Sequence, residues 1–224
     1  MTSRLKAAAP LAIVIAVLAL IWVEFSLNFT FHWVTSGDLG NGLSLPASFH
    51  LIVPTAFVSW GLFFAAGADS SALQKVAVAS VVGTLGGLFV MALAPEVADL
   101  PDFWGIAVVV AVAAFLVVMV SVVGDWYYVP GIFGAFAATI FWWIATGLDN
   151  WAPDGGGVGN SVKALGDPAT AGAGAFGGVL STPYVWVWVN TLVTLLIGCA
   201  LGLISVKLTG ILTPAAKPDR EAAK

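Results

Sequence analysis

Long apolar runs alternate with short polar connections along the whole chain. A transmembrane helix needs about 20 consecutive apolar residues, and six runs of roughly this kind precede the polar tail at 209–224. The pattern therefore predicts an all-α, polytopic membrane protein. The six predicted helices lie at about 7–28, 50–67, 75–93, 103–123, 128–148 and 183–208.

Two of these runs share the same beginning and the same end. Val53–Asp69 and Val129–Asp149 both open with Val-Pro and close with Gly-x-Asp, and their first residues are 76 positions apart, whereas their last residues are 80 apart. The later run is therefore about one helical turn longer. Proline at a helix start is also ordinary boundary chemistry, so this match alone does not establish a repeat.

The runs that follow these two segments match as well. Gly83–Leu88 and Gly198–Leu203 both combine small residues at a four-residue spacing with a leucine. Small residues at that spacing allow two membrane helices to approach closely. We therefore predict an internal duplication, with one repeat at about 7–95 and the other at about 103–208. The predicted helix-packing positions are six glycines: Gly83, Gly87, Gly131, Gly134, Gly198 and Gly202.

Composition agrees with a membrane protein and restricts where function can lie. Hydrophobic residues make up 60% of the chain and charged residues only 9%, whereas about a quarter of residues are charged in soluble domains. The 224 residues form a single membrane domain with no room for a large extramembrane unit. One cysteine, Cys199, allows no intramolecular disulfide. No basic cluster is present, so we expect no nucleic-acid partner.

Basic residues predict the orientation of the helices. With six helices, all but one of the basic residues fall on the same side as the N-terminus, and the exception is Lys163. The positive-inside rule then places both termini in the cytoplasm. The first and fourth helices enter from opposite sides, so the two repeats would be inverted, with three helices each. Inverted repeats place a shared pathway near mid-membrane, where their paired helices meet.

Few residues in the apolar runs carry ionisable side chains. Glu24 is the acidic residue within a helical run, and such a carboxylate is either functional or close enough to the interface to reach water. His32 and His50 are expected on the same outer side, where the three could sense protons or bind a divalent metal. Their scattered spacing is a weak ligand pattern, and we predict no metal and no cofactor.

Aromatic and small residues alternate on the second and fifth predicted helices. Trp60, Phe133 and Phe136 lie among glycines and alanines, and packing or interface anchoring explains most such aromatic side chains. The same arrangement would also leave a narrow, largely apolar path, with Ser59, Thr139 and Asn190 as its polar groups. A lining of this kind suits a small neutral or weakly polar solute better than a hydrated ion.

The segments Phe57–Gly67 and Val129–Thr139 resemble the YcdZ-like family of small bacterial inner-membrane proteins of unknown function. The resemblance covers the second to sixth helices and implies a bacterial cytoplasmic-membrane location, but it supplies no activity. The chain departs from the family in its long connections at 29–48 and 149–182. The second of these either re-enters the membrane or forms a flexible connection.

Two functional interpretations remain open from the sequence. The first is a channel or transporter for a small solute, favoured by the inverted repeat and the small-residue helix faces. The second is a non-catalytic subunit or anchor, either in a homo-oligomer or beside a partner membrane subunit, favoured by the lack of intramembrane charge. An enzyme is not expected, because no nucleophile elbow, zinc motif, Walker sequence or dinucleotide fingerprint is present.

Overall fold

The computed structural model describes residues 2–34, 46, 48–97, 100–101, 104–146 and 182–213. Most of these residues form helices, as predicted. The connections at 35–45 and 147–181, which include Lys163, and the tail beyond 213 lie outside the described residues. The six α-helices are α1 Thr2–Asn28, α2 Val53–Ala65, α3 Ser70–Leu93, α4 Trp104–Val120, α5 Val129–Ala145 and α7 Tyr184–Leu212. Short helical turns at Phe29–Val34, Pro95–Val97 and Ser121–Val123 extend α1, α3 and α4.

Within the described residues, four helices are long and apolar enough to cross a membrane. They are α1 with its extension, α3, α4 with its extension, and α7. α2 and α5 have only 13 and 17 residues, and at 1.5 Å per residue they are shorter than the roughly 30 Å hydrocarbon core. The predicted membrane character is therefore confirmed for four helices, whereas α2 and α5 need neighbouring segments to complete a crossing.

Local chemistry explains where the helices begin and end. Pro54 and Pro130 lie in the first turns of α2 and α5, where a missing N–H has no cost. α3 begins at Ser70, earlier than predicted, because the Asp69 carboxylate accepts a hydrogen bond from the Ala72 amide at 2.7 Å. This is an N-cap, which satisfies a backbone donor that the helix itself leaves unpaired.

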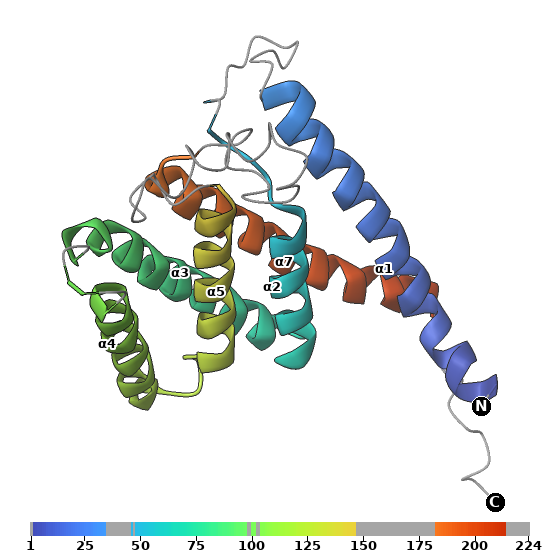
Figure 1. Ribbon diagram of the computed structural model, residues 1–224. Helices are drawn as coiled ribbons and strands as arrows, with labels where there is room; N and C mark the ends of the chain where they lie inside the picture. The colour runs from blue at the N-terminus through green and yellow to red at the C-terminus, as the bar shows by residue number, and fades with distance from the viewer. Residues whose placement is uncertain are drawn as a thin grey trace, which may run out of the picture.

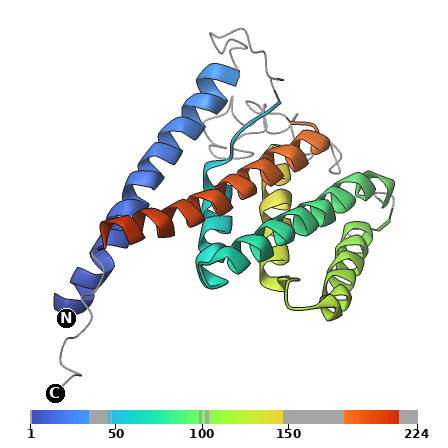
Figure 2. The same cartoon turned by 180° about the vertical axis from the view of Figure 1, so that it is seen from behind.

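The helices form a bundle in which α3 and α7 cross α2 and α5 obliquely (Figures 1 and 2). α7 packs chiefly against α2, and α3 packs chiefly against α5. α3 and α7 also contact each other in the middle of the bundle. We call the end at which α2 and α7 begin and α3 and α5 finish the upper end, as it is drawn in Figure 1.

α1 and α4 lie at the edges of the bundle. α1 leans away from the other helices, with α7 as its main partner, and α4 lies beside α3 (Figure 1). Both helices expose large apolar side chains, for example Leu20 at 70% and Phe115 at 63%. Such surfaces suit contact with lipid chains, so any polar chemistry must lie between α2, α3, α5 and α7 or where α1 meets them.

Candidate functional site in the helical bundle

A short extended segment, Phe49–Ile52, leads into α2 at the upper end. Its backbone amides cannot bond within a helix, so side chains of α1 and α7 accept from them. Three successive amides donate in this way: His50 N to Asn190 Oδ1 at 3.1 Å, Leu51 N to Thr30 Oγ1 at 3.0 Å and Ile52 N to Thr194 Oγ1 at 3.3 Å. Non-helical backbone at membrane depth requires this protection.

Carbonyl groups of the same region are also satisfied by side chains. The Leu51 carbonyl accepts from Ser26 Oγ and Thr30 Oγ1, each at 3.1 Å, and the Val53 carbonyl accepts from Trp22 Nε1 at 3.1 Å. Trp22, Ser26 and Thr30 are four residues apart, so they lie on one face of α1. α1 is thus fixed to the start of α2 by a stripe of hydrogen bonds.

Asn190 uses both ends of its amide to hold this segment. Besides accepting from His50 N, its Nδ2 donates to the Ser48 carbonyl at 2.9 Å. Asn190 is fully buried and His50 is 3% exposed. These two sequence candidates, 140 positions apart, therefore meet in one structural junction between α7 and the chain before α2.

Glu24 and His32 lie elsewhere. Both are exposed, and Asn28 links them: its Nδ2 donates to Glu24 Oε1 at 3.0 Å, and its Oδ1 lies 2.7 Å from His32 Nδ1. Glu24 is two residues from Trp22, which is about 200° around a helix, so Glu24 lies on the face of α1 opposite the stripe that contacts the segment carrying His50. The structure does not bring the three together, and within the described ranges no group of three acidic, His or Cys side chains could hold a metal.

The predicted packing glycines lie where helices cross. A Cβ at Gly83 would collide with the Ile132 carbonyl and Ala135 of α5, and one at Gly198 would collide with the Ala56 carbonyl and Ser59 of α2. Four further contacts complete the set: Gly87 with Thr139, Gly202 with Phe63, Gly131 with Ala79, and Gly134 with Leu62. At Gly83 and Gly198 the helix backbones are too close for any side chain. At the other four positions the nearest atoms belong to side chains, and at Gly134 the nearest is the end of Leu62 at 3.0 Å.

Three small polar side chains meet where α2, α3 and α7 converge. The Cys199 thiol of α7 lies close to the hydroxyl groups of Ser59 on α2 and Ser80 on α3. Ser59 Oγ also donates to the Leu195 carbonyl at 2.6 Å, and Ser80 Oγ donates to the Val76 carbonyl at 2.8 Å. Sequence reasoning selected Ser59 but missed Ser80, although Ser80 and Thr84 form a polar pair four residues apart on an otherwise apolar helix.

The aromatic candidates have different environments. Trp60 is 3% exposed and stacks on Phe57 with ring centroids 5.6 Å apart. Phe133 is 43% exposed, and together with Phe136 and Gly83 it lines an apolar pocket of about 50 Å³ between α3, α4 and α5. Thr139 is fully buried against Gly87 and donates to the Ala135 carbonyl at 2.8 Å.

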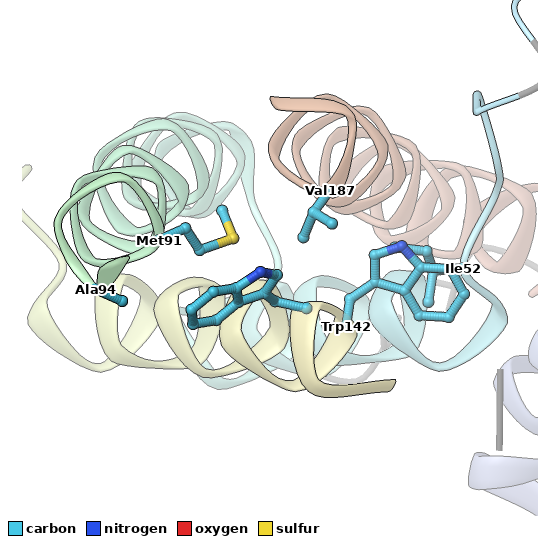
Figure 3. Close-up of a cluster of buried hydrophobic side chains, with 6 residues drawn as sticks. Ile52, Met91, Ala94, Trp142 and Val187 are labelled. Carbon is cyan, nitrogen blue, oxygen red and sulfur yellow. The ribbon is translucent and has the colours of Figure 1, made fainter. Parts of the chain in front are cut away.

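At the upper end, bulky side chains fill the space between the central helices. Met91 of α3 and Val187 of α7 point toward each other, and Trp142 lies against Ile52 (Figure 3). Trp143 belongs to the same cluster and is 1% exposed. A second pocket, of about 160 Å³, lies beside this cluster between α1, α5 and the start of α2, and its lining includes Leu51, Phe141 and Trp142.

Comparison with known families finds a match over most of the chain. A family model described as a protein of unknown function, DUF1097, matches residues 12–210. The chain belongs to the DUF1097 family. The matched region begins in α1 and ends in α7, so it includes the whole bundle. No curated protein and no solved structure matches the chain. The resemblance to YcdZ-like proteins and the bacterial origin stay predictions.

Proposed function

We propose that this DUF1097 protein is a membrane channel or transporter for a small neutral or weakly polar solute. In this proposal the bundle is a three-plus-three inverted repeat in a bacterial inner membrane, with both termini in the cytoplasm. α2 and α5 complete their crossings with the segments that adjoin them.

Matched contacts support the inverted repeat. Gly83 and Gly198 are 115 positions apart, and so are Gly87 and Gly202; Ile132 and Ala56 are 76 apart, and so are Thr139 and Phe63. Each glycine touches the partner that this correspondence requires, because Gly83 meets Ile132 where Gly198 meets Ala56, and Gly87 meets Thr139 where Gly202 meets Phe63. One pseudo-two-fold operation would therefore exchange the α2–α7 pair with the α5–α3 pair.

The chemistry of the core supports an uncharged solute. Among the described residues, the buried polar side chains are serines, threonines, Asn190 and His50. The observation that carries the proposal is this buried, almost entirely uncharged polar set within a membrane bundle. A hydrated ion would need charged groups or rings of carbonyls in place of its water, and an ion-coupled pump would need an intramembrane charge relay.

Flux measurements on purified protein in liposomes test the proposal. Stopped-flow light scattering would compare neutral amides and alcohols of increasing size with a charged solute such as acetate. We expect protein-dependent flux for the smallest neutral solutes, a steep decline with size, and none for acetate. Flux equal to that of protein-free liposomes for every neutral solute would contradict a transport function.

The second candidate, a non-catalytic subunit or anchor in a larger assembly, has its own observation. α4 is apolar on all sides and mostly exposed, and together with α3 it forms an open apolar groove of about 460 Å³ that includes Phe89 and Leu116. Native mass spectrometry from detergent would show whether the protein is a homo-oligomer or retains a stoichiometric partner. A defined hetero-complex without solute flux would favour this alternative.

A further inference from the structure

We infer that the solute path runs along the α3–α7 interface, which separates two groups of helices. Each group combines two helices of one predicted repeat with one helix of the other. One group, the first group, consists of α1, α2 and α7. The other, the second group, consists of α3, α4 and α5. The solute path rests on the proposed transport function, whereas the division into groups rests on the contacts between helices.

The two closest helix pairs, α3 with α5 and α2 with α7, lie within the groups, and the α3–α7 contact between the groups comes next. α2 packs chiefly on α7, α3 chiefly on α5, α1 mainly on α7 and α4 mainly on α3. Five of the six crossing glycines make contacts of this kind, since Gly83 and Gly87 meet α5, Gly131 meets α3, and Gly198 and Gly202 meet α2. The sixth, Gly134 of α5, meets the Leu62 side chain of the first group. Backbones in direct contact cannot slide without a collision, so each group should move as one body.

Side-chain hydrogen bonds also join the elements of the first group to one another. The segment before α2 is joined to α1 through Thr30 and to α7 through Asn190 and Thr194. All of these bonds join elements of the first group. A rearrangement that separated α2 from α7 would leave buried amides without hydrogen-bond partners, which is strongly unfavourable.

The interface between the groups has a different lining. Ser80 of α3 meets Cys199 of α7, and Met91 of α3 lies in the same cluster as Val187 of α7 (Figure 3). These two contacts define an antiparallel packing. Residues four positions apart share a helix face, so Thr84 lies on the α7-facing side of α3, and Thr191 and Leu195 lie on the α3-facing side of α7.

The polar groups on this interface define a class of solute. The hydroxyl hydrogens of Ser80, Thr84 and Thr191 already donate to backbone carbonyls, at 2.8, 3.1 and 2.8 Å. Their oxygens therefore remain as hydrogen-bond acceptors. A solute between the groups would be an uncharged molecule rich in N–H or O–H donors, such as a small amide or alcohol.

The described conformation is closed at the upper end. Met91, Trp143 and Val187 occupy the space between the groups there, and each is at most 1% exposed. A solute could pass only if the two groups move apart at this cluster. Rigid-body motion of packed groups around a central site is the usual mechanism of inverted-repeat transporters.

The natural cysteine offers a matched pair of cross-links. Ser80→Cys would place a thiol of the second group beside Cys199 of the first, and Ser59→Cys would place one beside the same Cys199 within the first group. Each variant serves as its own control, because flux is measured before oxidation, after oxidation and after reduction. Disulfide yield is read from maleimide labelling of the remaining thiols.

We expect oxidation to reduce flux by about tenfold or more in Ser80→Cys and by less than about twofold in Ser59→Cys, with recovery on reduction, because only the first disulfide joins the moving groups. Equal sensitivity of the two variants to oxidation, at equal disulfide yield, would overturn the inference. If the wild type shows no flux, the proposed function fails and a second measurement decides the division into groups.

That second measurement uses spin labels at exposed positions in a Cys199→Ser background. The pair Val81 and Leu196 spans the two groups, whereas Phe57 and Leu196 lie within the first group; all three side chains are 39% exposed. We expect a broader distance distribution for the first pair, and a shift on adding a transported amide for that pair alone. Distributions of equal width would show that the groups are not separate bodies.

Discussion

The α2–α7 and α5–α3 helix pairs make the same crossing contact, but the segments that precede α2 and α5 differ. In both pairs a glycine of the longer helix meets a backbone carbonyl of the shorter one, Ala56 in α2 and Ile132 in α5. α2 follows an extended segment whose amides bond to polar side chains. α5 instead follows Tyr127, which packs in an apolar cluster with Ala79 and Ile132.

The other ends differ by one helical turn. α5 has 17 residues and α2 has 13, which agrees with the offsets of 76 and 80 at the two ends of the matched runs. The additional turn carries Trp142 and Trp143, which fill the upper end of the bundle. The two helix pairs therefore share a crossing geometry but differ at their ends. The hydrogen-bonded segment before α2 and the two tryptophans of α5 both help to close the upper end of the bundle.

The largest expected effect comes from adding a side chain at a crossing. Gly198→Leu would drive a Cβ into the Ala56 carbonyl, and overpacking of this kind costs about 1–3 kcal/mol or more. We expect the detergent-solubilised variant to melt about 6–12 °C lower at 3 kcal/mol, and Gly83→Leu to behave alike. Gly61→Leu is the matched control, because nothing lies within 4 Å of a Cβ there. Three similar melting curves would contradict the crossing geometry.

Removing the side-chain amide of Asn190 at the upper end should have the next largest effect on stability. Asn190→Leu leaves the His50 amide and the Ser48 carbonyl without their side-chain partner, and each unsatisfied buried group costs about 1–3 kcal/mol. Lys75 occupies the position on α3 that corresponds to Asn190 on α7, 115 residues earlier. Lys75→Leu should change the melting temperature little. A larger loss for Lys75→Leu than for Asn190→Leu would reverse the comparison.

The smallest effect concerns the crossing itself. Ser59 and Ala135 are 76 positions apart, and Ser59 Oγ donates to the Leu195 carbonyl at 2.6 Å. Ser59→Ala should lower the free energy of unfolding by about 1 kcal/mol, the usual net value of a buried hydrogen bond. Ala135→Ser should regain part of it by donating to the corresponding carbonyl, that of Ser80. Thermal unfolding of the single and double variants measures this change. A further loss of stability in the double variant would argue against equivalent crossings.

On α1, the spacing of polar residues indicates the buried face better than the presence of a single charged residue does. Glu24 stands out in the sequence as a carboxylate in an apolar run, but helix geometry places it on the exposed face of α1. Trp22, Ser26 and Thr30 give a clearer signal, a polar stripe four residues apart that faces the bundle. That stripe was available from the sequence, because the helical period alone puts its members on one face.

The amino-acid sequence predicts the all-helical membrane character, the matched segments and the glycines at which helices touch. These features follow from local rules: apolar runs of sufficient length form helices in a bilayer, and small residues four apart mark faces that can pack closely. Such rules act within one helix, so they apply before any partner is known.

The choice of which helices meet follows from the three-dimensional fold. The fold paired α2 with α7 and α3 with α5, so that each pair combines helices from different predicted repeats. It also joined Asn190 to His50 across 140 positions. A buried amide must find a partner, but many hydroxyl and amide side chains could serve, and only the three-dimensional approach of α7 to the chain before α2 selects one of them.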